Sequence, residues 1–124
     1  MAREIEKAEA SPDRVGEWLK LRNTLGDELL AGLLGIRPAR LRAYAFGHAT
    51  TPEVVTARLR ELTDIAYNLS GAFNNFGMQR WFARPRKAFS GESPASLLGA
   101  MWDPEGPAID RVRNLAASPN SPTS

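Results

Sequence analysis

Basic side chains are the chemically active groups that this sequence gathers most clearly. Residues 80–87 contain four of them and no acid, and residues 37–60 contain five arginines and a single glutamate. Guanidinium and ammonium groups form charge-assisted hydrogen bonds with phosphates and carboxylates. The two basic segments therefore predict contact with a nucleic acid or with an acidic protein surface. The net charge of the whole chain, +2, is too small to decide between these partners.

Groups that could carry out catalysis are scarce. The chain has one histidine, His48, and no cysteine, so no Ser/His/Asp or Cys/His set can be recognised. Spacings typical of metal ligands are absent from the sequence. Residues 90–93 lack the Gly-Lys-Ser/Thr end of a phosphate-binding P-loop. We therefore expect a protein that is not an enzyme and that uses no metal or cofactor.

Composition also bears on where the protein acts. The absence of cysteine excludes disulfides and fits a reducing cytosol. No apolar run approaches the roughly 20 residues that a membrane span requires. Residues 1–20 carry charged side chains and no apolar centre, which argues against a secretory signal. We expect a cytoplasmic protein without membrane contact.

Apolar residues recur at helical spacing and no stretch alternates as a strand would, so the sequence predicts an all-α fold. The longest helix is expected from 52 to about 74, with Thr51 as its N-cap and Pro52 in its first turn. Shorter helices are expected at 12–25, 27–34, 36–47, 77–82 and 94–101, and in a last segment that carries Ile109, Val112 and Leu115.

These helices fall into two parts. Residues 15–74 are expected to form a helical bundle that includes the long helix, and residues 75–117 a small helical domain broken by prolines. At 43% hydrophobic residues, the chain can form one domain or two helical subdomains that share a core. Residues 1–14 are predicted to be a flexible segment. The Ser/Pro/Asn composition of residues 118–124 predicts a disordered tail.

Residues 27–46 fit the helix-turn-helix pattern. That motif needs apolar contacts between its two helices, a small residue where they cross, and a glycine whose φ is positive in the turn. The residues at these positions are Leu30, Leu34, Ile36, Leu41 and Tyr44 for the contacts, Ala31 for the crossing and Gly35 for the turn. A helix hairpin that only packs is the alternative, because leucine-rich helices with one glycine are common.

If this motif binds DNA, its second helix presents arginines to a groove, where guanidinium groups can contact guanine edges. Arginines beside it could meet phosphates, a contribution that does not depend on base sequence. The histidine in the following polar loop could meet a phosphate, although a solvated loop residue is the commoner case. The predicted DNA contacts are Arg37, Arg40, Arg42, His48 and Arg58.

Large apolar side chains gather in residues 76–117. They either fill a small core or anchor an interface, because tryptophan, other aromatics and arginine dominate both kinds of contact. For Trp81 and Phe82 we favour the core. The side chains concerned are Met78, Trp81, Phe82, Phe89, Met101 and Trp102.

The order of these features resembles the Xre/MbcA/ParS-type antitoxins. In that family a helix-turn-helix and a long helix precede a stretch with the pattern W-[FL]-x-x-P-x-x-x-[FL]-x-G-x-[ST]-P-x-x-L-[LV]. The resemblance covers about residues 20–117, and its second part is more specific than the helix-turn-helix. The matching residues are Trp81, Phe82, Pro85, Phe89, Gly91, Ser93, Pro94, Leu97 and Leu98.

The resemblance implies that residues 75–117 form a toxin-binding domain. Its partner would be a RES-domain toxin, an enzyme that degrades NAD⁺ and that the antitoxin holds inactive. The resemblance also implies a homodimer that can repress its own operon through operator DNA. Carried over by position, the expected toxin contacts are Arg80, Trp81, Arg84, Arg86, Lys87, Phe89, Trp102 and Asp103.

The chain departs from the family at two places. Residues of the second helix that would face a groove include Pro38, Ala39 and Ala43, which offer little to base edges. The Ser/Pro/Asn tail stands where some members use their C-terminus against the toxin. Two other interpretations therefore stay open: a stand-alone helix-turn-helix regulator of transcription, and a helical adaptor without either activity.

Overall fold

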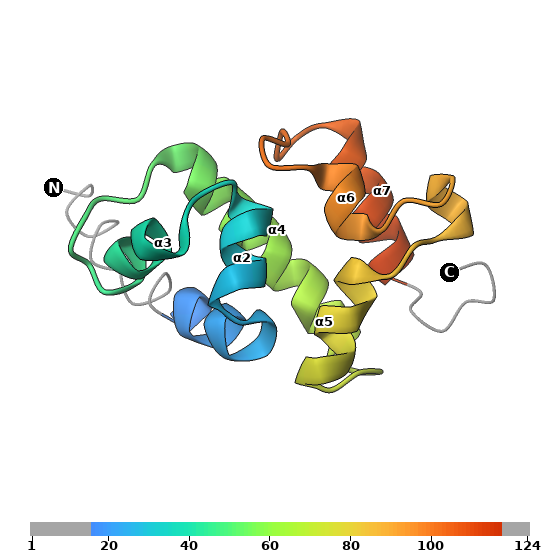
Figure 1. The fold of residues 1–124 in the computed structure, drawn as a ribbon, viewed down its shortest axis with the longest axis horizontal. Helices are drawn as coiled ribbons and strands as arrows, with labels where there is room; N and C mark the ends of the chain where they lie inside the picture. Colours follow the sequence, from blue (N-terminus) through green and yellow to red (C-terminus); the bar gives the residue numbers. More distant parts are fainter. Residues whose placement is uncertain (1–15, 118–124) are drawn as a thin grey trace, which may run out of the picture.

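The computed structural model describes residues 16–117, and all of their regular secondary structure is helical (Figure 1). This confirms the all-α class. The predicted flexible segment 1–14 and the predicted tail 118–124 lie outside the described residues. A first helix includes residues 16–25. It is followed by α2 (Asp27–Leu34), α3 (Pro38–Ala45), α4 (Glu53–Leu69), α5 (Asn75–Ala83), the short 3₁₀ helix η1 (Lys87–Phe89), α6 (Pro94–Leu98) and α7 (Pro107–Ala116).

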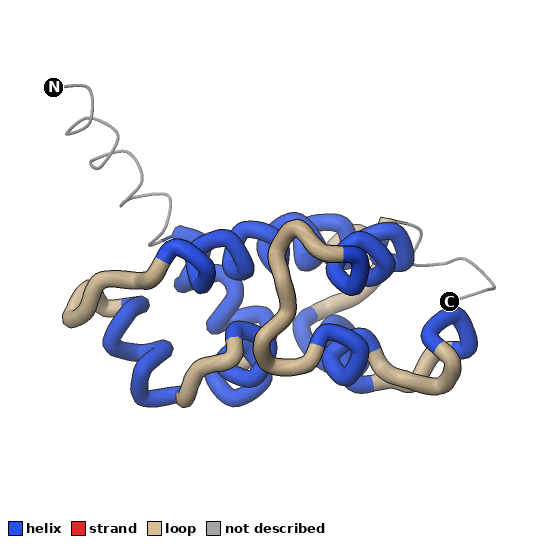
Figure 2. The backbone as a smooth tube through the Cα atoms, turned by 90° about the horizontal axis from the view of Figure 1, so that it is seen from above, coloured by secondary structure: helices blue, strands red, loops and turns tan. Residues whose placement is uncertain are grey.

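The longest helix, α4, runs through the middle of the molecule, with α3 towards one end and α6 and α7 towards the other (Figures 1 and 2). Helix α2 packs on both α3 and α4, and α7 packs on α4 and α6. Within residues 16–117, no helix is both long enough and apolar enough to cross a membrane.

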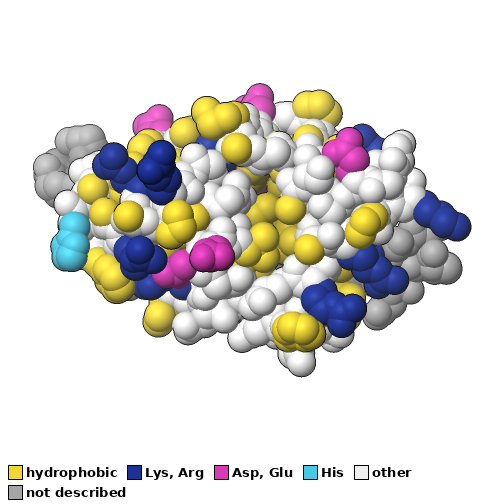
Figure 3. All heavy atoms as spheres, in the orientation of Figure 1, with side chains coloured by type: hydrophobic (Ala, Val, Ile, Leu, Met, Phe, Trp, Pro, Cys, Tyr) yellow, Lys and Arg dark blue, Asp and Glu magenta, His cyan; other side chains and the backbone are white. Residues whose placement is uncertain are grey.

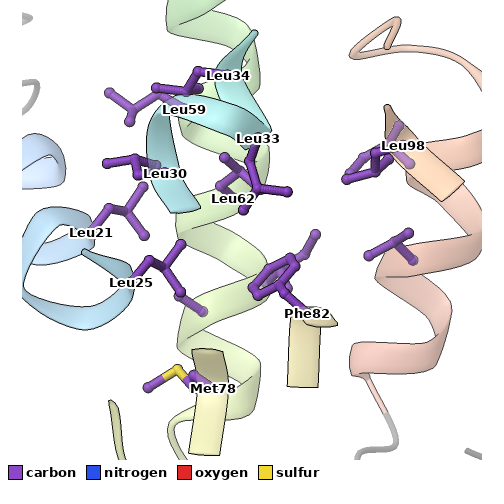
Figure 4. Packing of buried hydrophobic residues seen from close by; sticks show 14 of the residues in the cluster. Leu21, Leu25, Leu30, Leu33, Leu34, Leu59, Leu62, Met78, Phe82 and Leu98 are labelled. Atoms are coloured by element: carbon purple, nitrogen blue, oxygen red, sulfur yellow. The ribbon is translucent and has the colours of Figure 1, made fainter. Parts of the chain in front are cut away.

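One hydrophobic core joins the two predicted parts of the chain. Its members come from the first helix, from α2 to α7 and from η1, and Phe82 of α5 packs in the same cluster as Leu62 of α4 (Figure 4). Helix α4 contributes its whole apolar face, which repeats at helical spacing. The residues before and after position 74 therefore share one core, and their division into two subdomains stays a prediction.

The ends of α4 differ from the prediction. Pro52, in an extended conformation, is the N-cap residue, and no side chain caps this end, so the expected cap by Thr51 is wrong. The helix also ends at Leu69, not near residue 74. The chain turns there, and Asn74 begins the next helix by accepting a hydrogen bond from the Gly77 amide at 2.8 Å. A capping asparagine satisfies an amide that would otherwise lack a partner, which explains why α5 starts earlier than expected.

The start of α6 confirms the predicted helix signal. Ser93 accepts a hydrogen bond from the Ser96 amide at 3.0 Å, and Pro94 occupies the first turn. The helix ends at Leu98, shorter than the expected range to 101. Met101 consequently lies outside the helix with 78% of its surface exposed, and it does not join the core as the apolar spacing suggested.

Candidate partner-binding surfaces

The turn between α2 and α3 is built as the sequence pattern predicted. Gly35 adopts the left-handed conformation with φ of 75°, and the Ile36 amide donates to the Ala31 carbonyl at 3.0 Å. Such a φ is costly for any residue with a side chain and costs glycine little. Leu41 of α3 is fully buried against the core. The packing of the two helices is thus confirmed, and the helix-turn-helix assignment stays a prediction.

The outer face of α3 is basic and hollowed. A depression of about 740 Å³ is lined by Ile36, Arg37, Ala39, Arg40, Ala43 and Tyr44. Arg37 and Arg40 are exposed, and within residues 16–117 neither forms an ion pair. The structure therefore brings these two predicted DNA contacts together on one accessible surface. His48 is also exposed, in the loop that follows α3.

Arg42 differs from its neighbours because an acid holds it. Its Nη1 lies 3.4 Å from Oδ2 of Asp27, whose other oxygen accepts a hydrogen bond from Nε of Arg22 at 2.8 Å. The hydrogen bond from Arg22 lowers the pKa of Asp27 below its usual range, and the charge of Arg42 adds to the effect. The Asp27 carboxylate is therefore ionised at neutral pH and competes with any external anion for Arg42.

Arg58 is not a surface residue, so its predicted contact with phosphates is wrong. It is 5% exposed, on the buried face of α4. Its Nε donates to the Trp102 carbonyl at 2.9 Å and its Nη1 donates to the Leu34 carbonyl at 3.2 Å. Carbonyls in the last turn of a helix have no partner within the helix. Arg58 provides a donor to one of these carbonyls at the end of α2, which explains its burial.

A second donor reaches the same end of α2 from far along the chain. The indole Nε1 of Trp102 donates to the Leu33 carbonyl at 2.6 Å. The backbones of the two segments also approach each other closely. A Cβ placed on Gly35 would lie 2.0 Å from the Ala100 carbonyl oxygen. Segment 99–103 is thus fastened to the end of α2. Sequence reasoning missed this contact, although α2 has no basic residue in its last turn and so needs donors from elsewhere.

The predicted toxin contacts divide into exposed and buried side chains. Half of the predicted set is buried, so the expected direct contact with a toxin is wrong for these side chains. They stabilise the fold beneath the exposed residues. The aromatic members fill the core because of their large apolar area. The exposed residues are Arg80, Arg84, Lys87 and Asp103, and the buried ones are Trp81, Arg86, Phe89 and Trp102.

Two of the exposed residues have local partners. Asp103 accepts a hydrogen bond from the Glu105 amide at 2.9 Å, so its carboxylate helps to form the turn before α7. The guanidinium of Arg80 lies 5.7 Å from the centre of the Phe76 ring, which is 65% exposed. Sequence reasoning did not single out Phe76. An exposed aromatic next to an arginine is typical of interface anchors.

The loop between α5 and α6 is a tight structure. The Gly91 amide donates to the Arg86 carbonyl at 2.8 Å, and the Arg86 amide donates to the Glu92 carbonyl at 3.1 Å. Gly91 has a φ of 90°, which accounts for the glycine at this place in the motif. Phe89 is buried below the loop, and the guanidinium of Arg111 lies 5.2 Å from the centre of its ring. The loop therefore presents Arg84 and Lys87 from a fixed support.

Residues 16–117 contain no group of three or more histidine, cysteine or acidic side chains able to hold a metal ion. Comparison with protein-family models, curated proteins and solved structures finds no match for this chain.

Proposed function

We propose that this protein is a cytoplasmic antitoxin that binds and neutralises a RES-domain, NAD⁺-degrading toxin. The observation that carries the proposal is the structure of the stretch that resembles the toxin-binding pattern. Its aromatic members Trp81 and Phe89 are buried, Gly91 has a positive φ, and Ser93 caps α6. Each of these residues has a structural role, and together they hold a basic loop in one conformation.

The exposed residues of this region are suited to binding a protein. Arg84 and Lys87 are exposed at the hydrogen-bonded loop, and within residues 16–117 neither forms an ion pair. Phe76 and Met101 are exposed apolar side chains elsewhere in residues 75–117. Neutralising an enzyme requires no chemistry from the antitoxin, only a surface that covers the toxin's substrate entrance. Charges at such a surface guide association, and apolar anchors provide much of the affinity.

Reversing the two exposed charges of the loop is the first test. We expect the double variant Arg84→Glu/Lys87→Glu to weaken the complex with the RES-domain toxin by about 100-fold, since each reversed charge at an interface costs on the order of 1–2 kcal/mol. Calorimetry with the purified toxin measures the affinity and the ratio of chains.

Arg60→Glu is the matched control. Arg60 is an exposed arginine of α4, remote in sequence from the loop, and it forms no ion pair within residues 16–117. This variant should bind the toxin as the parent protein does. The proposal fails if the parent protein neither binds the toxin nor suppresses its NAD⁺ degradation. It also fails in its choice of surface if the control loses as much affinity as the double variant.

Binding of operator DNA is a second candidate function. It is favoured by Arg37 and Arg40, which line the hollow on α3 and form no ion pair within residues 16–117. Figure 3 shows basic side chains over α3 and, separately, at the opposite end of the molecule. The two basic surfaces use different elements, so one chain can act as both antitoxin and repressor. The alanines of α3 favour contacts with phosphates over contacts with bases.

A gel-shift titration with the protein's own promoter tests this candidate. We expect Arg37→Gln/Arg40→Gln to lower DNA affinity about tenfold and to reduce the dependence on salt, because two phosphate contacts are lost. Arg42→Gln should have a smaller effect, since Asp27 already holds Arg42. Retardation that is weak, indifferent to sequence and equal in all three proteins would argue against DNA binding.

A further inference from the structure

Arg86 is a buried cation without an acidic partner in residues 16–117. It is 5% exposed, and its Nη2 donates to the Trp81 carbonyl at 3.0 Å. Its Nε is buried and has no hydrogen-bond partner among residues 16–117. The ion pairs within residues 16–117 are formed by other arginines. A buried charge is costly unless it is paired and hydrogen-bonded, so Arg86 retains a capacity for an anion that the described residues do not use.

The groups around Arg86 compensate its charge only in part. Its guanidinium lies 5.1 Å from the centre of the Trp81 ring, a contact that stabilises a cation weakly. The nearest acid in sequence, Glu92, is exposed and accepts a hydrogen bond from the Ser96 hydroxyl at 3.2 Å. Burial lowers the pKa of Arg86, and the neighbouring charge of Arg84 lowers it further. The charged group that acts on Arg86 is therefore another cation and not an acid.

A hollow of about 390 Å³ opens at this position. It is lined by Pro85, Arg86, Lys87, Ser90 and Gly91. Lys87 and Ser90 are exposed, so an ammonium group and a hydroxyl are available at its edge. Ser90 is the one residue other than glycine, within the described chain, whose φ is positive, at 56°. Non-glycine residues in this conformation carry strain, and such strain concentrates at ligand sites.

We propose that this hollow binds a phosphate group. Arg86 and Lys87 supply the positive charge, and the hydroxyl of Ser90 supplies a further hydrogen bond. Two cations at one site favour a dianion over the single charge of a carboxylate, and charge-assisted bonds to phosphate are stronger than neutral ones. The phosphate can be inorganic or can belong to a small phosphomonoester, since both present the same oxygens. The site does not depend on the proposed toxin partner.

The test uses the full chain with inorganic phosphate as the probe, at a constant ionic strength balanced with chloride. Calorimetry and the thermal midpoint should both report saturable binding. Amide NMR shifts should localise to residues 85–91. A parallel titration with glycerol 3-phosphate distinguishes the sources: tighter binding of the ester than of the free ion identifies a phosphomonoester, and the reverse identifies inorganic phosphate. Acetate should bind at least tenfold more weakly than either.

Variants separate the site from a general effect of charge. Lys87→Gln alters an exposed side chain and should weaken phosphate binding about tenfold, whereas Arg60→Gln, at an exposed arginine of α4, should leave it unchanged. Arg86→Gln should abolish the saturable response, and its fold is checked by circular dichroism. The proposal is overturned if phosphate gives no saturable response beyond chloride, if the two exposed variants lose affinity equally, or if acetate binds as well as phosphate.

Discussion

Replacing Gly35 with alanine is expected to destabilise the protein by more than about 4 kcal/mol, a value in the range of the largest single-substitution effects. A Cβ at this position would lie 2.0 Å from the Ala100 carbonyl oxygen and 3.1 Å from its carbon. Both atoms belong to the backbone, so no rotation of a side chain relieves the overlap. Domains of this size have only 5–15 kcal/mol of stability in total. Urea unfolding followed by circular dichroism measures the loss.

Gly47→Ala is the matched control for this substitution. Gly47 has almost the same φ, 78° against 75° for Gly35, but a Cβ placed on it meets nothing within 4 Å. Its substitution should therefore cost only the conformational penalty, about 1–2 kcal/mol. The difference between the two variants isolates the overlap with Ala100. Equal losses would mean that segment 99–103 does not press on the turn between α2 and α3.

The local signals of the fold could be predicted from the sequence because each is complete within a few residues. The glycine at position 35 predicted a positive φ, and the pair Ser93–Pro94 predicted the start of α6. The contact of Gly35 with Ala100 could not be predicted in this way. It depends on how two distant segments pack, and no periodicity or capping signal records that arrangement.

In the candidate toxin-binding site, too, features that depend on packing could not be predicted from the local sequence. Arg84 and Arg86 are separated by one residue and are equivalent by composition, yet Arg84 is exposed and Arg86 is buried against Trp81. That difference arises from the fold of the loop. For Arg58 a signal was present, since this arginine lies between Val55 and Leu62 on the apolar face of α4. An arginine at a core position of a helix predicts a buried hydrogen-bonding role. The prediction of a DNA contact considered only the charge of Arg58.

The burial of Trp102 changes how a loss of binding must be interpreted. Removing its side chain takes away core volume and the donor to the Leu33 carbonyl. Removal of a large buried side chain destabilises a protein by about 3–5 kcal/mol. Trp102→Ala would therefore weaken a toxin complex by loosening the antitoxin itself. Variants of exposed residues are the ones that report on the contact surface.

Arg58→Met is expected to lower stability by about 3 kcal/mol and to release segment 99–103 from α2. Methionine can fill much of the space of the aliphatic part of arginine but donates no hydrogen bond. The Leu34 and Trp102 carbonyls would lose the donors that they now have at 3.2 and 2.9 Å. A buried polar group without a partner costs about 1–3 kcal/mol. Hydrogen exchange should show the amides of residues 99–103 opening before the amides of α4 do.

Arg60→Met, two positions further along α4, is the control for this last prediction. Arg60 is exposed, and substitutions at such positions usually change stability by less than about 0.5 kcal/mol. Trp102→Phe completes a double-mutant cycle, because it removes the bond from the indole to the Leu33 carbonyl and keeps the ring in the core. We expect a coupling above about 0.5 kcal/mol between Arg58→Met and Trp102→Phe, since both donors serve the same helix end. Additive losses would show that the two donors act independently, and equal losses in Arg58→Met and Arg60→Met would show that the end of α2 does not depend on Arg58.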